Sequence, residues 1–354
     1  MCTLKEIILV KYAAEFINDF DIRSLVNRLK DETLKTAIRR KLSAFYIPSS
    51  LKDEIIALIK PIALEVNNWR EDHIGIFTAT QKFPHKFYFH ANGTLDRIKT
   101  ADLLIQSKLL PEEKRFLLAC QYWSSREVLT FFENMRKTPR NRILRKYSKE
   151  NRNFNEYEEN VAKWIDHFRA GSAMRYDPWD DFTDVSLQSR RLEDLSKENC
   201  KSLLGGVFED TEKMHVGRFC LSRMSADHQE DVLKHFPLNV LRIYLFRPYH
   251  QFFMNAANRV WDRLSGKDFD CLLHIIICQK ILGLWEDFDY VDLLRQFWCR
   301  SPEYLKQYIE STEIFQILIE MVKNEFYPKF APTYFFLHAK CFEDNAVLCN
   351  DITK

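Results

Sequence analysis

The sequence predicts an all-α protein, an array of short antiparallel helical hairpins that is α-solenoid-like. Apolar residues recur at three- and four-residue spacing along most of the chain, which is the period of a helix with one buried face. Only 8 of the 354 residues are glycine, about a third of the usual share. Phosphate-binding loops and many β-turns need glycine where φ is positive, whereas helical hairpins do not. A hydrophobic fraction of 46% is sufficient for a folded core.

Residues 1–94 are expected to form an N-terminal helical region. Thr3 and Glu6 have capping-box spacing and open the first helix. Residues 21–46 follow as one broken helix or two short ones, because their apolar positions keep a helical period on both sides of the interruption. The N-terminal region therefore begins with two or three short helices.

The next helix begins near Ser50 and contains Pro61, which should kink it. Helical periodicity is lost over residues 69–94, so we expect an irregular connection there, with room for one short hairpin. This connection is the expected domain boundary, and residues 95–354 are expected to form a C-terminal helical-hairpin array. The alternative is that both regions form one continuous array.

Short joints connect the helices expected in the C-terminal region. A second irregular segment, near residues 170–189, interrupts them, and the pair Gly205 and Gly206 is expected to break a helix. After residue 327 we expect one last short helix. Helix starts are expected near Glu212, Ala226, Pro237, Pro248, Lys267, Asp287, Pro302 and Glu313.

Two segments resemble each other loosely and suggest a degenerate helical repeat. Arg115-Phe116-x-Leu118 is matched by Arg218-Phe219-x-Leu221, and each is followed by a similar apolar helix. Two copies do not define a fixed period, so chance similarity of apolar helices is the alternative interpretation.

Part of the sequence resembles a lineage-expanded family of uncharacterised arthropod all-helical proteins. The segments that carry the resemblance are RFCLSRMSADHQEDVLKHFPLNVLRIYL, NAANRVWDRLS and DYVDLLRQFW. The resemblance extends over residues 95–326. It implies a helical fold, and it brings no catalytic motif, cofactor or ligand to this chain.

Composition limits the classes of function. The formal charge of +2 gives no long-range field for a polyanion or a membrane. The nine cysteines are odd in number and contain no CxxC pair, which favours a reducing compartment. We find no signal peptide and no apolar run long enough to span a bilayer, so the expected location is intracellular, cytoplasmic or nuclear.

Cys271, His274 and Cys278 are the best candidate for a metal site. They fall at i, i+3 and i+7, on one helical face, and two thiolates with an imidazole suit zinc. The flanking residues are apolar nearly all round, however, as in a central core helix. A core helix is therefore the favoured interpretation, and we expect no metal and no cofactor.

Other polar groups are more readily explained as surface or packing residues. His85 and His90 have no accompanying cysteine or carboxylate cluster. Cys120 and Cys220 lie on apolar helices, where burial quenches thiol reactivity. Two clusters of carboxylates are interpreted as solvent-exposed charged residues, although paired carboxylates can also transfer protons. The clusters are Asp177, Asp180, Asp181 and Asp184, and Glu286, Asp287 and Asp289.

The basic segment 136–152 is the most concrete binding signal. It holds eight Lys or Arg against one acid, and the candidate polyanion-binding residues within it are Arg140, Arg142, Arg145 and Lys146. Intramolecular pairing with the acidic loop around Asp180 is the alternative explanation.

We expect a non-enzymatic intracellular interaction or scaffold protein that presents a surface to a protein partner, because helical arrays offer extended binding surfaces without catalytic machinery. The first alternative is polyanion or nucleic-acid binding through the basic segment. The second is an enzyme with no recognisable motif, since the sequence contains no GxSxG, P-loop, kinase or HExxH motif. The oligomeric state is not indicated.

Overall fold

The computed structural model describes residues 3–19, 22–23, 31–77, 86–123, 125–147, 153–170, 192 and 195–323. The fold is all-α, as predicted. Within the described residues the only β-type pairing is an isolated antiparallel bridge between Phe89 and Leu95, in the segment where the sequence left room for a short hairpin. None of the described helices is long and apolar enough to cross a bilayer.

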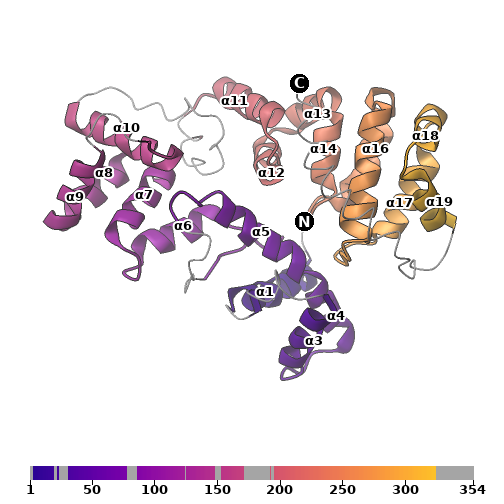
Figure 1. Cartoon of the computed structure of the whole chain (residues 1–354), viewed down its shortest axis with the longest axis horizontal. Helices are drawn as coiled ribbons and strands as arrows, with labels where there is room; N and C mark the ends of the chain where they lie inside the picture. Colours follow the sequence, from indigo (N-terminus) through magenta and orange to yellow (C-terminus); the bar gives the residue numbers. More distant parts are fainter. Residues whose placement is uncertain are drawn as a thin grey trace.

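The first half of the chain folds around one hydrophobic core, which runs from Leu9 to Ile165 and which we call the N-lobe (Figure 1). The Thr3–Glu6 capping box is confirmed, because each side chain accepts a hydrogen bond from the other's backbone N–H. The helices of the N-lobe are α1 (Leu4–Asn18), α3 (Asp31–Leu42), α4 (Ser49–Ala57), α5 (Ile59–Glu71), α6 (Arg97–Gln106), α7 (Glu112–Tyr122), α8 (Ser125–Asn134), α9 (Lys137–Tyr147) and α10 (Glu156–Ala170).

Helix α5 is one of the elements of the N-lobe that meet the second half of the chain. The disturbance expected at Pro61 appears as a break at Leu58, and Pro61 lies in the first turn of α5, where its missing N–H costs little. One face of α5 buries Ile62, Val66 and Trp69 against α1 and α4. The helix extends to Glu71, three residues into the segment predicted to be irregular.

The second half of the chain has a separate core, from Leu192 to Met321, which we call the C-lobe. Its helices pack mostly on near neighbours in the sequence, including α13 on α14, α14 on α16, and α17 on α19. They are α11 (Lys197–Asp210), α12 (Met214–Arg223), α13 (Ala226–His235), α14 (Pro237–Tyr244), α15 (Phe253–Val260), α16 (Gly266–His274), α17 (Tyr290–Arg300), α18 (Glu303–Glu310) and α19 (Phe315–Lys323), with 3-10 turns at His250–Phe252 and Trp261–Arg263.

The helix break expected at Gly205 and Gly206 is wrong, because α11 continues through both residues. Each glycine costs a helix about 1 kcal/mol relative to alanine. Burial of the flanking residues Leu203, Leu204, Val207 and Phe208 outweighs that cost. Tertiary packing therefore overrides the local preference.

A π-helix, η6 (Ile275–Ile281), continues α16 and ends in a tight turn. Gly283 is required there, because a Cβ atom on it would lie 2.1 Å from the carbonyl oxygen of Gln279. Leu284 has a φ of 54°, a left-handed conformation that is rare for leucine. This turn directs the chain from η6 back into α17.

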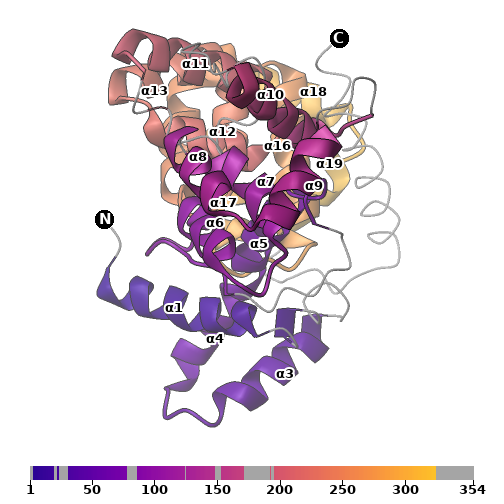
Figure 2. The ribbon, with the colours of Figure 1, turned by 90° about the vertical axis from the view of Figure 1, so that its left-hand side faces the viewer.

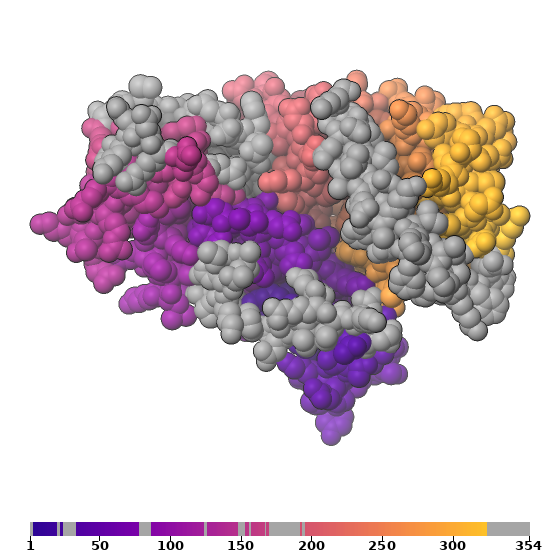
Figure 3. Space-filling model, in the orientation of Figure 1, coloured from indigo at the N-terminus to yellow at the C-terminus, as the bar shows by residue number. Residues whose placement is uncertain are grey.

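The two lobes lie side by side, with α5 and α12 at their junction (Figure 1). In the view turned by 90°, helices α7 to α10 of the N-lobe stand in front of the C-lobe (Figure 2). The part of the N-lobe that contains α3 and α4 projects from the lower edge of the molecule (Figure 3). The N-lobe core contains residues on both sides of residue 94. The domain boundary near residue 94, the solenoid-like array and the repeat stay predictions. The expected irregular segment near 170–189 and the expected last helix lie outside the described residues.

Candidate functional site

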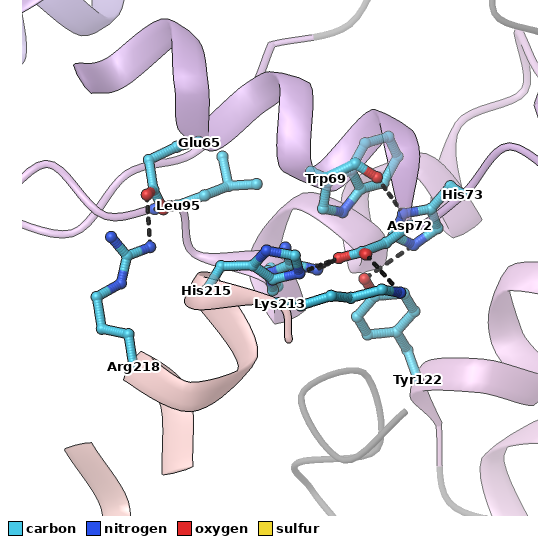
Figure 4. A network of polar contacts seen from close by, with 10 residues as sticks. Glu65, Trp69, Asp72, His73, Leu95, Tyr122, Lys213, His215 and Arg218 are labelled. Atoms are coloured by element: carbon cyan, nitrogen blue, oxygen red, sulfur yellow. Dashed lines mark hydrogen bonds and ion pairs between the residues drawn. The ribbon is translucent and has the colours of Figure 1, made fainter. Parts of the chain in front are cut away.

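The junction between the lobes holds a network of buried charged side chains around Asp72 (Figure 4). Asp72 lies at the end of α5, and its side chain is 6% exposed. Arg97 Nη1 and His215 Nε2 each lie 2.7 Å from Asp72 Oδ2, and Lys213 Nζ lies 3.3 Å from Oδ1. Two of these partners come from the C-lobe, so Asp72 ties the start of α12 to the N-lobe.

The electrostatics of Asp72 favour its ionised form. Burial alone would raise the pKa of Asp72, but the hydrogen bond from His215 and the charges of Arg97 and Lys213 outweigh burial and hold this pKa well below its usual value. Burial lowers the pKa of His215 in spite of its bond to Asp72. Burial thus favours the neutral form of His215, whose Nε2 faces the carboxylate at 2.7 Å.

A second buried ion pair joins the lobes, two turns before Asp72 on α5. Glu65 Oε1 lies 2.5 Å from Arg218 Nη2 of α12, and its other oxygen accepts a hydrogen bond from the backbone N–H of Leu95 at 3.1 Å. Burial alone would raise the pKa of Glu65. The charge and the hydrogen bond of Arg218 outweigh burial, so this pKa is lower than its usual value. Both oxygens of this buried carboxylate are thus bonded, as a stable buried ion pair requires.

Behind Asp72, His73 is fully buried in an aromatic stack. Its ring stacks on Trp69 with centroids 3.9 Å apart. Its Nδ1 lies 2.5 Å from the carbonyl oxygen of Trp69, and its Nε2 lies 3.0 Å from the hydroxyl of Tyr122. Burial lowers the pKa of His73 to about 3, so this imidazole is neutral at physiological pH. The stack fixes the end of α5 on which Asp72 depends.

A cavity of about 490 Å³ lies between the lobes beside these ion pairs. Its apolar wall combines one residue of the N-lobe with four of the C-lobe: Leu64, Met214, Ile243, Phe246 and Trp285. Polar groups stand at its edge, namely Asn68, Glu71, Lys213 and Gln279. An apolar recess with a few polar groups, at a boundary between two structural units, is where ligands most often bind.

A second cavity, of about 370 Å³, shares His215 and Arg218 with the first. These two side chains therefore form a common wall of both cavities. The second cavity is more polar, and its other charged residues are Glu65, Asp96, Arg97 and Arg223. Most of these charges are already bonded within the junction, so the first cavity is the better candidate for a ligand.

The candidate metal residues do not assemble into a metal site. Among the described residues, no group of three or more His, Cys, Asp or Glu side chains could hold a metal ion. Cys271 and Cys278 are buried in the C-lobe core, and Cys278 Sγ lies 4.0 Å from His274 Nδ1. The seven-residue spacing presumed an α-helix throughout, but the helix changes to π geometry at Ile275.

The basic segment forms helix α9, and its residues differ in their surroundings. Lys146 Nζ lies 3.1 Å from Glu113 and 2.9 Å from Glu158, and these hydrogen bonds raise the pKa of Lys146 in spite of its partial burial. Arg140 donates to the carbonyl oxygen of Glu133. Arg142 and Arg145 are exposed and form no ion pair with any described residue. The pairing expected with the loop around Asp180 lies outside the described residues.

The remaining candidates are distributed over the structure. Cys120 and Cys220 are buried, and burial raises the pKa of Cys220 to about 12. Asp289 caps α17 by accepting from the N–H of Asp292, as a helix-start carboxylate is expected to do. Asp287 is instead buried. The positions of His85 and of the carboxylates from 177 to 184 lie outside the described residues.

Sequence reasoning missed the junction. Glu65, Asp72, His215 and Arg218 belong to no motif, and 141 residues separate Asp72 from Lys213. The only available signal was local: Glu65 and Asp72 interrupt the apolar face of a helix whose other inward positions are Ile, Val and Trp. Comparisons with protein-family models, with curated proteins and with solved structures found no match.

Proposed function

We propose that this chain is a non-enzymatic interaction protein whose inter-lobe cavity receives a segment of a protein partner. The observation that carries the proposal is the cavity of about 490 Å³ with an apolar wall from both lobes. Its volume lies in the range of roughly 300–1,000 Å³ that is typical of binding pockets. Pockets at protein interfaces hold the anchor side chains that supply most of the energy of binding.

The ion pairs of the junction support binding more than catalysis. Asp72 and Glu65 are both held in their ionised forms by partners that are hydrogen-bonded to them. A general acid or base needs a pKa near the working pH, whereas the pKa values of these carboxylates are lowered away from it. Their role in this proposal is to hold the two walls of the cavity at a fixed separation.

The edge of the cavity indicates what kind of segment would fit. Leu64, Asn68 and Glu71 are spaced four and three residues apart, so they share one face of α5, and all three line the cavity. Glu71 is exposed and forms no ion pair with a described residue. We therefore expect a partner segment with an apolar anchor residue and a Lys or Arg beside it.

Photo-crosslinking in cells tests this proposal. A benzophenone amino acid placed at Asn68, in the cavity, should crosslink a partner, whereas the same group at the exposed position Lys163 on α10 should not. Met214→Trp should abolish the Asn68 crosslink by filling the cavity, with the circular dichroism spectrum confirming that the variant folds. Identical crosslinks from both positions, or a crosslink that survives Met214→Trp, would contradict the proposal.

Polyanion binding through α9 is the second candidate, and the exposure of Arg142 and Arg145 favours it. These two arginines can reach phosphates, whereas Lys146 is engaged by Glu113 and Glu158. Neutralising Arg142 and Arg145 together should lower the salt concentration needed for elution from heparin, because each phosphate contact contributes to the salt dependence. Lys146→Gln is the matched control. Equal elution of the double variant and the unaltered protein would exclude α9.

A further inference from the structure

Lys280 is a fully buried lysine inside the π-helix η6. Lys280 is 1% exposed, and its Nζ makes no hydrogen bond to any described residue. The nitrogen lies between two aromatic faces, 3.5 Å from the ring centroid of Phe246 and 3.6 Å from that of Trp285. π-Helical turns are rare, and they occur frequently at functional sites.

A buried carboxyl group, that of Asp287, lies near enough for its charge to act on this lysine. The side chain of Asp287 is 1% exposed, and its Oδ2 accepts no hydrogen bond from a described residue. The Tyr290 hydroxyl joins Asp287 Oδ1, at 3.2 Å, to His250 Nε2, at 2.9 Å. Lys280, Asp287, Tyr290 and His250 thus form one buried polar cluster inside the C-lobe.

Burial changes the protonation of this cluster. It lowers the pKa of Lys280 to about 7, although the charge of Asp287 opposes the shift. It also raises the pKa of Asp287, although Lys280 and the hydrogen bond from Tyr290 oppose that shift. A neutral amine and a carboxyl group that can carry a proton are the two groups that condensation with a carbonyl compound requires.

The amine lies one ring away from the inter-lobe cavity. Phe246 and Trp285, whose faces enclose the nitrogen, also line that cavity. Trp285 follows directly on the left-handed Leu284, and Lys60 of the N-lobe donates hydrogen bonds to the carbonyl oxygens of Gly283 and Leu284. The turn that positions Trp285 is therefore held by the other lobe.

We propose that Lys280 is a covalent binding site for a small aldehyde, which enters the inter-lobe cavity and reaches the amine when the Trp285 ring turns aside. The nitrogen attacks the carbonyl carbon and forms a C–N bond. The carbonyl oxygen takes a proton from Asp287 and a second one from the nitrogen, and leaves as water. The product is an iminium ion beside the Asp287 carboxylate, and transfer of the remaining nitrogen proton to Asp287 gives the neutral imine and restores the carboxyl group.

This inference goes beyond the proposed partner binding and is tested without a partner. The folded protein is incubated at pH 7 with propanal and sodium cyanoborohydride, which delivers hydride to the imine carbon and makes the bond permanent. Labelling of each lysine is then followed by peptide mass spectrometry. The internal reference is the exposed Lys267, and the same reaction in urea is the control for folding.

Lys280 should be labelled faster than Lys267 in the folded protein and at the same rate in urea. A lysine with a pKa near 7 has roughly 10³-fold more neutral amine at pH 7 than one with the usual pKa of about 10.4. Two effects reduce this advantage: the Trp285 ring has to turn aside, and an amine of lower pKa is a weaker nucleophile. We therefore expect Lys280 to be labelled at least about 10-fold faster than Lys267.

Two variants test the route to the amine. Met214→Trp, which fills the cavity, should slow labelling of Lys280 and leave Lys267 unchanged, whereas Trp285→Ala should accelerate labelling of Lys280. Labelling of Lys280 no faster than that of Lys267 in the folded wild-type protein would overturn the proposal, and that measurement needs no variant to fold. Labelling that is fast but insensitive to Met214→Trp would overturn the cavity as the route.

Discussion

The replacement Asp72→Asn tests whether the ionic network at the junction holds the two lobes together. Asparagine keeps the size of the side chain but removes its charge, which leaves Arg97, only 13% exposed, without its counter-ion. Removing one partner of a buried ion pair costs about 3–5 kcal/mol. Lys213 is half exposed and can return to water, so we expect a loss at the lower end, about 3 kcal/mol.

Urea unfolding at pH 7.5, followed by far-UV circular dichroism, measures this loss. With a denaturant dependence of about 3 kcal/mol per molar urea, the midpoint should fall by about 1 M. Asp53→Asn is the matched control, because Asp53 forms an ion pair with Arg39 in which both side chains are more than half exposed. Such a pair contributes about 0–1 kcal/mol.

The difference between wild type and Asp72→Asn should also depend on pH with a defined sign. The pKa of Asp72 is lower in the folded than in the unfolded protein. Its contribution is therefore fully present above the unfolded pKa of about 3.9 and is lost as the pH falls below that value. A midpoint shift no larger than that of Asp53→Asn, or one that grows on acidification, would refute this account of the junction.

Three further predictions concern the interior of the lobes. Burial lowers the pKa of both His73 and His250 to about 3, so the unfolded chain binds more protons below its histidine pKa of about 6.5. Stability should fall by about 2 kcal/mol per histidine between pH 7.5 and pH 5, and His73→Phe should reduce the slope of unfolding free energy against pH. Leu241→Asp or Ile276→Asp should abolish the cooperative thermal transition, because each side chain is fully buried; a soluble variant that melts like Leu109→Asp, at an exposed position, would contradict this. Gly206→Ala should stabilise α11 by about 1 kcal/mol, since its Cβ meets open space. Gly266→Ala should instead lower the melting temperature, because its Cβ would lie 2.3 Å from the Tyr308 ring. Equal effects of the two substitutions on the melting temperature would contradict the packing at Tyr308.

The fold class could be predicted because helix signals are local. The capping box at Thr3 and Glu6 and the start of α14 at Pro237 are confirmed at the expected residues. The error at Gly205 and Gly206 has a non-local cause, because the burial of Leu204 and Phe208 is decided by the surrounding helices. Local patterns thus locate helices well and interruptions less well.

The candidate site could not be predicted, because its parts come together only in three dimensions. Asp72 and His215 lie on different lobes, and neither has a neighbour in sequence that marks it. Lys280 did leave a trace, as the only charged residue in the apolar run from Cys271 to Leu284 apart from His274. On a helical projection it resembles an ordinary polar position, and only the change to π geometry and the rings of Phe246 and Trp285 show that it is buried.

The separation of the two hydrophobic cores has a consequence for the cooperativity of unfolding. Polar contacts join the lobes, among them the ion pairs of Asp72 with Lys213 and of Glu65 with Arg218, while each lobe keeps its own apolar interior. Parting the lobes would then hydrate mainly charged groups and expose little apolar surface, which is the surface that gives unfolding its large positive heat capacity. We therefore expect that calorimetry in concentrated salt resolves two unfolding transitions, with the heat-capacity increment divided between them and almost none assigned to the step that separates the lobes.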